Sequence, residues 1–279
     1  MASSLNPSGP PARALPREDP YDGSDELEDG SGGKMSFLEH LDELRKRLIA
    51  ALLALSGGVL VAFLFIEQIF GFIMRPLQQM LPEGSKLTYI EPTEAFMLYI
   101  KVAVLAGLVL AAPFVLWQLW LFIAPGLYAK EKRLAIPFMV MSTGFFLGGA
   151  LFSHYLVFPW AWRFLASFNN DYMMFEPRVK AVFALYAQML LAMGLVFEMP
   201  TVVLFLARMH LVTARFLIRN VKYAVLIIFI AAAVITPTGD MVTQALMAGP
   251  MLGLYVLSIL IAWIFGKRGG PRSDGDGRA

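Results

Sequence analysis

Apolar positions follow two different patterns along this chain of 279 residues. Between residues 37 and 48, leucines recur at intervals of three and four residues: Leu38, Leu41, Leu44 and Leu48. This spacing predicts an amphipathic helix with one apolar stripe, and the opposite face carries three acids followed by three basic residues. From Leu48 onward the polarity ends and a long apolar run begins. The pattern therefore predicts a charged helix that leads directly into a membrane span.

Six apolar segments follow one another, at about 48–70, 95–123, 134–165, 181–206, 223–235 and 241–265. Because about 20 apolar residues are needed to cross a bilayer, the 13-residue segment 223–235 is short for a span. We predict an all-α integral membrane protein with six transmembrane helices. The fifth and sixth would form a short hairpin that reaches the far interface only where the bilayer thins.

Polar connections separate these segments at 71–95, 124–133, 166–180, 207–222 and 236–240. Residues 1–33 are rich in proline, glycine, serine and acid, and residues 267–279 are polar and glycine-rich. Such stretches cannot bury enough apolar surface to offset their conformational entropy. We predict a disordered acidic tail at 1–33, one membrane domain at 34–266 and a disordered tail at 267–279.

Composition supports the membrane assignment and narrows the chemistry. Hydrophobic residues make up 58% of the chain and charged residues 16%, with a mean hydropathy of +0.63. The absence of cysteine excludes disulfides, thiol chemistry and cysteine-based metal sites. The N-terminus lacks the basic and apolar regions of a signal peptide, so we expect the first span to act as an uncleaved insertion signal.

Positive charges are divided unequally between the two sides of the six-span arrangement. Seventeen of the 23 lysines and arginines lie in the tails and on the side of the 124–133 and 207–222 connections, and six lie on the other side. Lysine and arginine concentrate on the cytoplasmic side of membrane proteins. The chain is therefore predicted to have both termini in the cytoplasm.

Catalytic and metal-binding patterns are missing from the sequence. The three histidines, His40, His154 and His210, lie in different segments, and there is no His-Glu-x-x-His pair. Neither a Gly-x-Ser-x-Gly elbow nor a phosphate-binding Gly-x-x-x-x-Gly-Lys-Ser/Thr loop is present. We therefore expect neither an enzyme nor a bound cofactor or metal.

Glu198 is a carboxylate inside the fourth apolar segment. Inserting such a group costs at least about 2.5–3.5 kcal/mol unless it faces protein, water or a partner. Pro200 removes a backbone hydrogen bond two residues later and should bend the helix there. Glu198 could tie helices together, or it could line a polar groove. In the second case Gln244 in the sixth segment is the obvious second polar group.

Two further acids are placed where a cationic partner could bind. Glu43 precedes the first span and can pair at helical spacing with Lys46 or Arg47, and Glu131 lies in the basic connection 124–133. Either acid alone could be an ordinary surface ion pair, worth less than about 1 kcal/mol. Both, however, are predicted at the cytoplasmic interface. Together they could bind a guanidinium through bidentate hydrogen bonds.

The motifs in order resemble the TatC family, the receptor subunit of the twin-arginine protein translocase. The resemblance covers about residues 35–265 and all six segments. The matching residues are His40-Leu41-x-Glu43-Leu44-Arg45-x-Arg47-Leu48, Pro76, Trp117-Gln118-Leu119-Trp120-Leu121-Phe122-Ile123-Ala124-Pro125-Gly126-Leu127-Tyr128, Glu131-Lys132-Arg133, Phe197-Glu198-Met199-Pro200, Thr236-Pro237-Thr238-Gly239-Asp240, Gln244 and Pro250.

The resemblance implies a concave, cup-like bundle of six helices with cytoplasmic termini in the bacterial inner membrane. It also implies recognition of signal peptides that carry paired arginines. The family's recognition residues match Glu43, Arg45, Arg47, Phe122 and Glu131. Its intramembrane glutamate matches Glu198, its polar hairpin positions match Asp240 and Gln244, and its outer-loop proline matches Pro76. Gly239 departs from the family, which often has Pro-Pro-Asp at this turn.

Taken together, residues and resemblance suggest one mechanism. The two arginines of a cargo signal peptide would dock against Glu43 and Glu131, and its apolar segment would lie near Glu198. Single-span partners resembling TatA and TatB would pack on the fifth–sixth hairpin, and transport would use the proton-motive force. A proton-coupled secondary transporter that uses Glu198 and a structural membrane scaffold are the alternatives, but neither requires Glu43 and Glu131 together.

Overall fold

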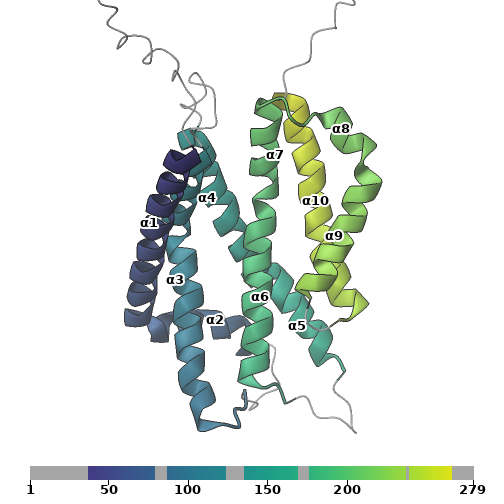
Figure 1. Cartoon of the computed structure of the whole chain (residues 1–279). Helices are drawn as coiled ribbons and strands as arrows, with labels where there is room; N and C mark the ends of the chain where they lie inside the picture. Colours follow the sequence, from purple (N-terminus) through teal and green to yellow (C-terminus); the bar gives the residue numbers. More distant parts are fainter. Residues whose placement is uncertain (1–36, 79–86, 124–134, 169–175, 237–238, 266–279) are drawn as a thin grey trace, which may run out of the picture. The chain divides into compact units, whose positions relative to one another are not determined.

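The computed structural model describes residues 37–78, 87–123, 135–168, 176–236 and 239–265 (Figure 1). The chain divides into two compact units, residues 1–42 and 43–279. The described part of the second unit is helical apart from short connections and one isolated pairing of Thr88 with Arg178. No β-strand occurs among the described residues, so the all-α prediction is confirmed for them. Both predicted tails lie outside the described residues.

Five helical stretches have the length and composition of membrane spans: Glu39–Leu64, Pro92–Ile123, Ile136–Ala166, Val179–Arg208 and Met241–Phe265. The remaining apolar helix, α9 (Val221–Ile235), is shorter, as the sequence predicts. A bilayer core of about 30 Å exceeds the reach of 15 helical residues at 1.5 Å each. Five spans are therefore supported by length, and a sixth crossing by α9 stays a prediction.

The other described helices form these stretches or, in the case of α2 and α8, lie between them. They are α1 (Phe37–Leu64), α2 (Ile66–Gln78), α3 (Pro92–Ile123), α4 (Ala135–Phe152), the π-helical segment η3 (Ser153–Val157), α5 (Phe158–Ala166), α6 (Val179–Phe197), α7 (Met199–Arg208), α8 (Ala214–Arg219) and α10 (Met241–Phe265). Figure 1 shows the long helices of the second unit running up and down beside one another.

The sequence predicts a first span that extends to residue 70 and a polar connection at 71–95. Helix α2 shows that this prediction is wrong. The first helix instead ends at Leu64, and a separate helix begins at Ile66. Its residues Ile73, Met74 and Leu77 are buried at helical spacing. They pack on the rest of the unit while α2 lies across α3 (Figure 1). Pro76 therefore belongs to the last turn of a helix that lies between the first and second candidate spans.

Helix α1 is the least covered of the five candidate spans. Only 6% of its most apolar window is buried, against 28–44% in the others. It comes close to α3 at Gly58 and Gly107. A Cβ added to Gly58 would lie 2.5 Å from the carbonyl oxygen of Gly107, and one added to Gly107 would lie 2.6 Å from Cα of Val59. The two glycines therefore allow the two backbones to come together.

A buried histidine links α2 to the centre of the unit. The π-helical segment η3 places His154 inside, where its exposed fraction is 3%. Its Nδ1 lies 3.0 Å from the hydroxyl of Tyr186 on α6, and its ring stacks on Phe72 of α2 with centroids 4.3 Å apart. Because π-bulges change which side chains face inward, this segment joins three helices at one point.

The connections before α3 and before α6 meet at one end of the unit. The amide of Thr88 donates to the carbonyl of Pro177 at 3.2 Å, and the amide of Val179 donates to the carbonyl of Thr88 at 3.0 Å. These two connections therefore lie at the same end, as required if both face the same side of a membrane. The sequence predicts that arrangement for 71–95 and 166–180.

Candidate functional site

Glu43, Arg47 and Gln118 form a polar network between α1 and α3. Glu43 and Arg47 are one helical turn apart on α1, a spacing that brings side chains together. Nη2 of Arg47 donates to Oε1 of Glu43 at 3.3 Å, and Nη1 donates to Oε1 of Gln118 on α3 at 3.3 Å. The predicted pairing of Glu43 with Arg47 is thus confirmed. We call these three residues the Glu43 network.

The Glu43 network leaves one carboxylate oxygen without a partner. Oε2 of Glu43 is buried and accepts no hydrogen bond from the described residues. The side chain as a whole is 17% exposed and that of Arg47 is 33% exposed, whereas Gln118 is buried. An ionised carboxylate has about four acceptor positions and can bind a guanidinium through both oxygens. Glu43 therefore retains capacity for a second cation beside Arg47.

The other recognition residues predicted from the sequence have different positions. Arg45 is exposed on α1, and its two-residue offset from Glu43 and Arg47 turns it about 200° away from them. Phe122 is half-buried in the last turn of α3, on the same face as Gln118 four residues earlier. Glu131 lies outside the described residues. The structure thus joins Glu43 with Arg47 but not with Arg45.

Gln118 was not predicted individually as a site residue. It lies near the end of the apolar helix α3 and is 8% exposed. A buried amide needs hydrogen-bond partners, so an isolated glutamine in a predicted span indicates a polar contact with another helix. That signal was present in the sequence, although it could not identify Arg47 as the partner.

Glu198 lies at an interruption between two helices. Helix α6 ends at Phe197, α7 begins at Met199, and Pro200 occupies the first turn of α7. Proline lacks the amide hydrogen needed to continue the pattern of α6, but it suits a helix start. The sequence predicts a bend at this proline, and the structure shows the helical pattern interrupted for one residue, at Glu198.

The side chain of Glu198 joins α4 to the α6–α7 junction. The hydroxyl of Ser142 on α4 donates to Oε2 of Glu198 at 2.6 Å, and both residues are buried. Oε1 of Glu198 is buried too and has no partner among the described residues. Glu198 therefore links helices, which was one of its two predicted roles. Its second oxygen is left for another donor, as a role in a polar groove requires.

Asp240 and Gln244 stabilise the hairpin of α9 and α10. The amide of Thr243 donates to Oδ1 of Asp240 at 2.6 Å, so Asp240 caps the N-terminus of α10. Nε2 of Gln244 donates to the carbonyl of Phe229 on α9 at 2.9 Å. Glu198 and Gln244 consequently have different hydrogen-bond partners. The turn before Asp240 uses Gly239 at φ 63°, a conformation that favours glycine.

The described residues show no arrangement for a metal ion. No group of three or more His, Cys, Asp or Glu side chains within the described ranges could hold one. The polar contacts between helices in the described part of the chain include the Glu43 network, the pair Ser142–Glu198, the pair His154–Tyr186 and the contact of Gln244 with α9.

The sequence is similar to a family of protein translocase components. Residues 39–250 match the family described as "Sec-independent protein translocase protein (TatC)". The protein of that name from Koribacter versatilis is 44% identical over 235 residues, covering 82% of this chain and 86% of that protein. The one from Helicobacter pylori (strain J99) is 41% identical over 227 residues, covering 80% and 87%.

Solved structures show the same likeness in three dimensions. A crystal structure described as "Twin Arginine Translocase Receptor- TatC" superimposes with a TM-score of 0.71 at 36% identity, covering 80% of this chain and 98% of that one. A second crystal structure of the receptor, in the detergent DDM, gives a TM-score of 0.73 at the same identity. The likeness therefore extends over most of both chains.

Proposed function

The chain belongs to the TatC family of Sec-independent protein translocase proteins, and from this premise we propose that it binds twin-arginine signal peptides of folded proteins. As a multi-pass membrane component of the twin-arginine translocase, it serves protein transport and is not an enzyme. In the proposal it receives signal peptides at the cytoplasmic face of the inner membrane and nucleates a translocase driven by the proton-motive force.

The observation that carries this proposal is the half-paired carboxylate of Glu43. One oxygen is bound by Arg47, and the other is buried and accepts nothing from the described residues. A carboxylate in that state favours an incoming guanidinium, because a second charge-assisted bond satisfies the remaining oxygen. Gln118 accepts a hydrogen bond from Nη1 of Arg47. This bond keeps the guanidinium from binding both oxygens of the Glu43 carboxylate.

The second arginine of the signal peptide would bind Glu131. That residue lies outside the described ranges, so its place in the proposal rests on the family resemblance and on its position in the connection after α3. Phe122 ends α3 on the face that bears Gln118 and would pack against the aliphatic part of an arginine side chain. Arg45 is exposed and would contact the peptide beyond the paired arginines.

The apolar part of the signal peptide would lie along the polar groove that Glu198 and Gln244 were predicted to line. Oε1 of Glu198 is buried without a donor among the described residues, so a hydroxyl or other donor carried by the peptide could bind it. Gln244 is committed to Phe229 and would contribute chiefly by holding the hairpin.

The remaining parts of the proposal concern assembly and orientation. Single-span subunits resembling TatA and TatB would pack on the α9–α10 hairpin, and several copies of this chain would associate in the translocase. Six helices would cross the inner membrane with both termini in the cytoplasm. The unequal distribution of lysine and arginine supports the cytoplasmic position of both termini.

Photo-crosslinking of a twin-arginine signal peptide to the full-length protein tests the proposal. Glu43→Gln and Glu131→Gln should each reduce crosslinking by about tenfold, since a charge-assisted hydrogen bond contributes about 1.5–3 kcal/mol. Gln118→Ala should reduce it less, because Arg47 would then be free to cover Glu43. A peptide with paired lysines in place of the arginines should bind the unchanged protein weakly.

Asp42→Asn is the matched control, because it removes a carboxylate from an exposed position beside Glu43 on the same helix. It should leave crosslinking unchanged. Normal crosslinking in a double variant of Glu43 and Glu131 would contradict the proposal, and so would equal binding of the arginine and lysine peptides.

A further inference from the structure

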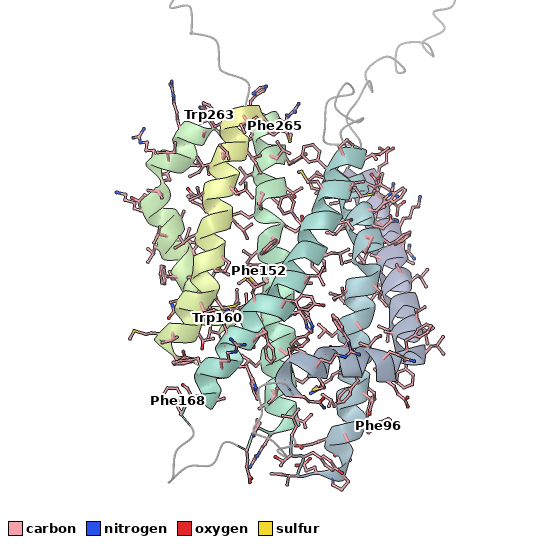
Figure 2. The ribbon with its side chains drawn as sticks, turned by 180° about the vertical axis from the view of Figure 1, so that it is seen from behind. Phe96, Phe152, Trp160, Phe168, Trp263 and Phe265 are labelled. Carbon is pink, nitrogen blue, oxygen red and sulfur yellow. The ribbon has the colours of Figure 1, made fainter. Side chains whose placement is uncertain are left out.

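An apolar groove separates α5 from the start of α10. It has a volume of about 510 Å³. Its apolar lining comes from Trp160 and Phe164 on α5 and from Val242 and Leu246 on α10. Trp160 is labelled in Figure 2 where α5 passes the α9–α10 hairpin, and 62% of its side chain is exposed. The groove therefore opens to the surroundings of the protein.

The groove lies near the ends of two candidate spans. Arg163 lines it three residues before the end of the span Ile136–Ala166, and Val242 and Thr243 line it at the start of the span Met241–Phe265. Both spans reach their polar ends at this point. Tryptophan and arginine are enriched at such a level, where one part of the side chain meets hydrocarbon and the other meets head groups.

Two polar groups at the groove lack partners. Arg163 is exposed, and no acidic side chain of the described residues lies within ion-pairing distance of it. Among the residues that line the groove, it is the one with a charge. The side chain of Thr243 is fully buried, and its hydroxyl makes no hydrogen bond within the described part of the chain. A cation and a hydroxyl thus line a groove that is otherwise apolar.

We propose that the groove between α5 and α10 binds one anionic phospholipid. The phosphate lies at Arg163, an ester oxygen lies near the hydroxyl of Thr243, and an acyl chain runs between Phe164 and Leu246. The parts of this lipid complement the lining of the groove. Its anionic end matches the cation, its ester acceptors match the hydroxyl, and its long apolar chain matches the apolar side chains. The proposal does not depend on the recognition of signal peptides by the Glu43 network.

A phospholipid suits the groove better than an extended peptide does. A peptide would bring backbone donors and acceptors into an apolar environment, and each unsatisfied group costs several kcal/mol there. The groove offers one cation and one hydroxyl, which satisfy a phosphate and an ester but not a series of amides. The net negative charge of the head group distinguishes the proposed lipid from a zwitterionic one with the same chains.

Native mass spectrometry of the purified full-length protein in mild detergent tests this site. Phosphatidylglycerol and phosphatidylcholine with identical acyl chains are titrated separately, and the fraction of protein with one bound lipid is measured. Phosphatidylglycerol should bind more tightly. Arg163→Gln should weaken its binding about fivefold, as expected for one basic residue near an anionic head group, and should remove the difference between the lipids.

A second variant tests the apolar part of the site. Leu246→Trp fills the groove and should weaken binding of both lipids, and Val242→Phe narrows the same groove if the first variant does not fold. Arg75→Gln is the matched control, because Arg75 is an exposed arginine on α2 that does not line the groove. It should bind both lipids as the unchanged protein does.

The proposal stands only if the arginine variant and a groove-filling variant both weaken binding of phosphatidylglycerol. Equal binding of the two lipids by the unchanged protein overturns it, as does a loss of the same size in Arg75→Gln. Weakening in the arginine variant alone would indicate nonspecific attraction of head groups, and it would overturn the assignment of the acyl chain to this groove.

Discussion

Glu43 shows how one residue acquires a role from neighbours that are distant in the sequence. Helical geometry places Glu39 and Glu43 on the same face of α1 and does not distinguish them. The structure does distinguish them, because Glu43 is bound to an arginine that Gln118 holds from α3. The resulting half-paired carboxylate depends on the crossing of two helices. A one-dimensional pattern cannot specify that crossing.

Glu198 carries the second residue-scale prediction. Glutamine at this position keeps an oxygen that can accept the hydroxyl of Ser142, whereas leucine leaves that hydroxyl buried without a partner. We expect Glu198→Gln to keep most export of a twin-arginine reporter and Glu198→Leu to lose it. Ser142→Ala should lower thermal stability in detergent by about 0.6 kcal/mol, the average for a hydrogen bond between membrane helices.

Thr143→Ala supplies the control for the serine variant, because it removes a hydroxyl from the next position of α4. Export that survives in Glu198→Leu as well as in Glu198→Gln would show that polarity at this site is unnecessary. Export lost equally in both would instead make ionisation the requirement.

At the scale of elements, the contact between α1 and α3 depends on a glycine. Gly58→Ala should destabilise the protein by about 1–3 kcal/mol, because the new methyl group would lie 2.5 Å from a backbone oxygen of α3. The adjacent Gly57 has nothing within 4 Å of its Cβ position. Gly57→Ala should therefore stabilise α1 by up to about 1 kcal/mol through helix propensity alone. Thermal unfolding followed by size-exclusion chromatography measures both.

The two glycine variants should differ in sign. Similar unfolding midpoints for the two would show that α1 does not pack on α3 at Gly58. Because α1 also carries Glu43 and Arg47, Gly58→Ala should in addition weaken signal-peptide crosslinking, whereas Gly57→Ala should not.

Helix α2 and the π-helical segment η3 are the elements that sequence patterns did not predict. The apolar residues of α2 continue directly from the first span, so hydropathy alone merges the two helices. Their separation at Leu64 reflects packing of Ile73, Met74 and Leu77 on other helices. The spacing of apolar residues does not reveal segment η3, because a π-helical segment adds only one residue to a turn. In the structure, His154 of this segment contacts Tyr186 and Phe72.

At the scale of the whole molecule, the distribution of charge predicts the orientation in the membrane. A reporter that is active only outside the cytoplasm should be inactive when fused after Arg219 and active when fused after Glu91. The reason is that the 207–222 connection holds four basic residues and no acid, while the side of Glu91 holds few cations. Activity after Arg219 would reverse the assignment. Fusions after Lys222 and after Pro177 repeat the comparison at independent positions.

The amino-acid sequence was sufficient to predict the membrane character, the order of the apolar segments, the shortness of α9, a disturbance of the helix at Pro200 and the family. Each of these depends on composition, on local spacing, or on the backbone chemistry of one residue. Such properties are present in the chain before it folds. The charge-based orientation belongs with them as a prediction that the fusion experiment tests.

Which polar groups meet became known from the fold. Arg47 binds Gln118, Glu198 binds Ser142, Gln244 binds the carbonyl of Phe229, and Arg163 lines an apolar groove. In an apolar medium a polar side chain needs a hydrogen-bond partner, which is often on another helix. The sequence shows that a partner is needed but does not identify it. The partner is fixed by where helices cross. Those crossings depend on small residues such as Gly58 and Gly107 acting on helices far apart in the chain.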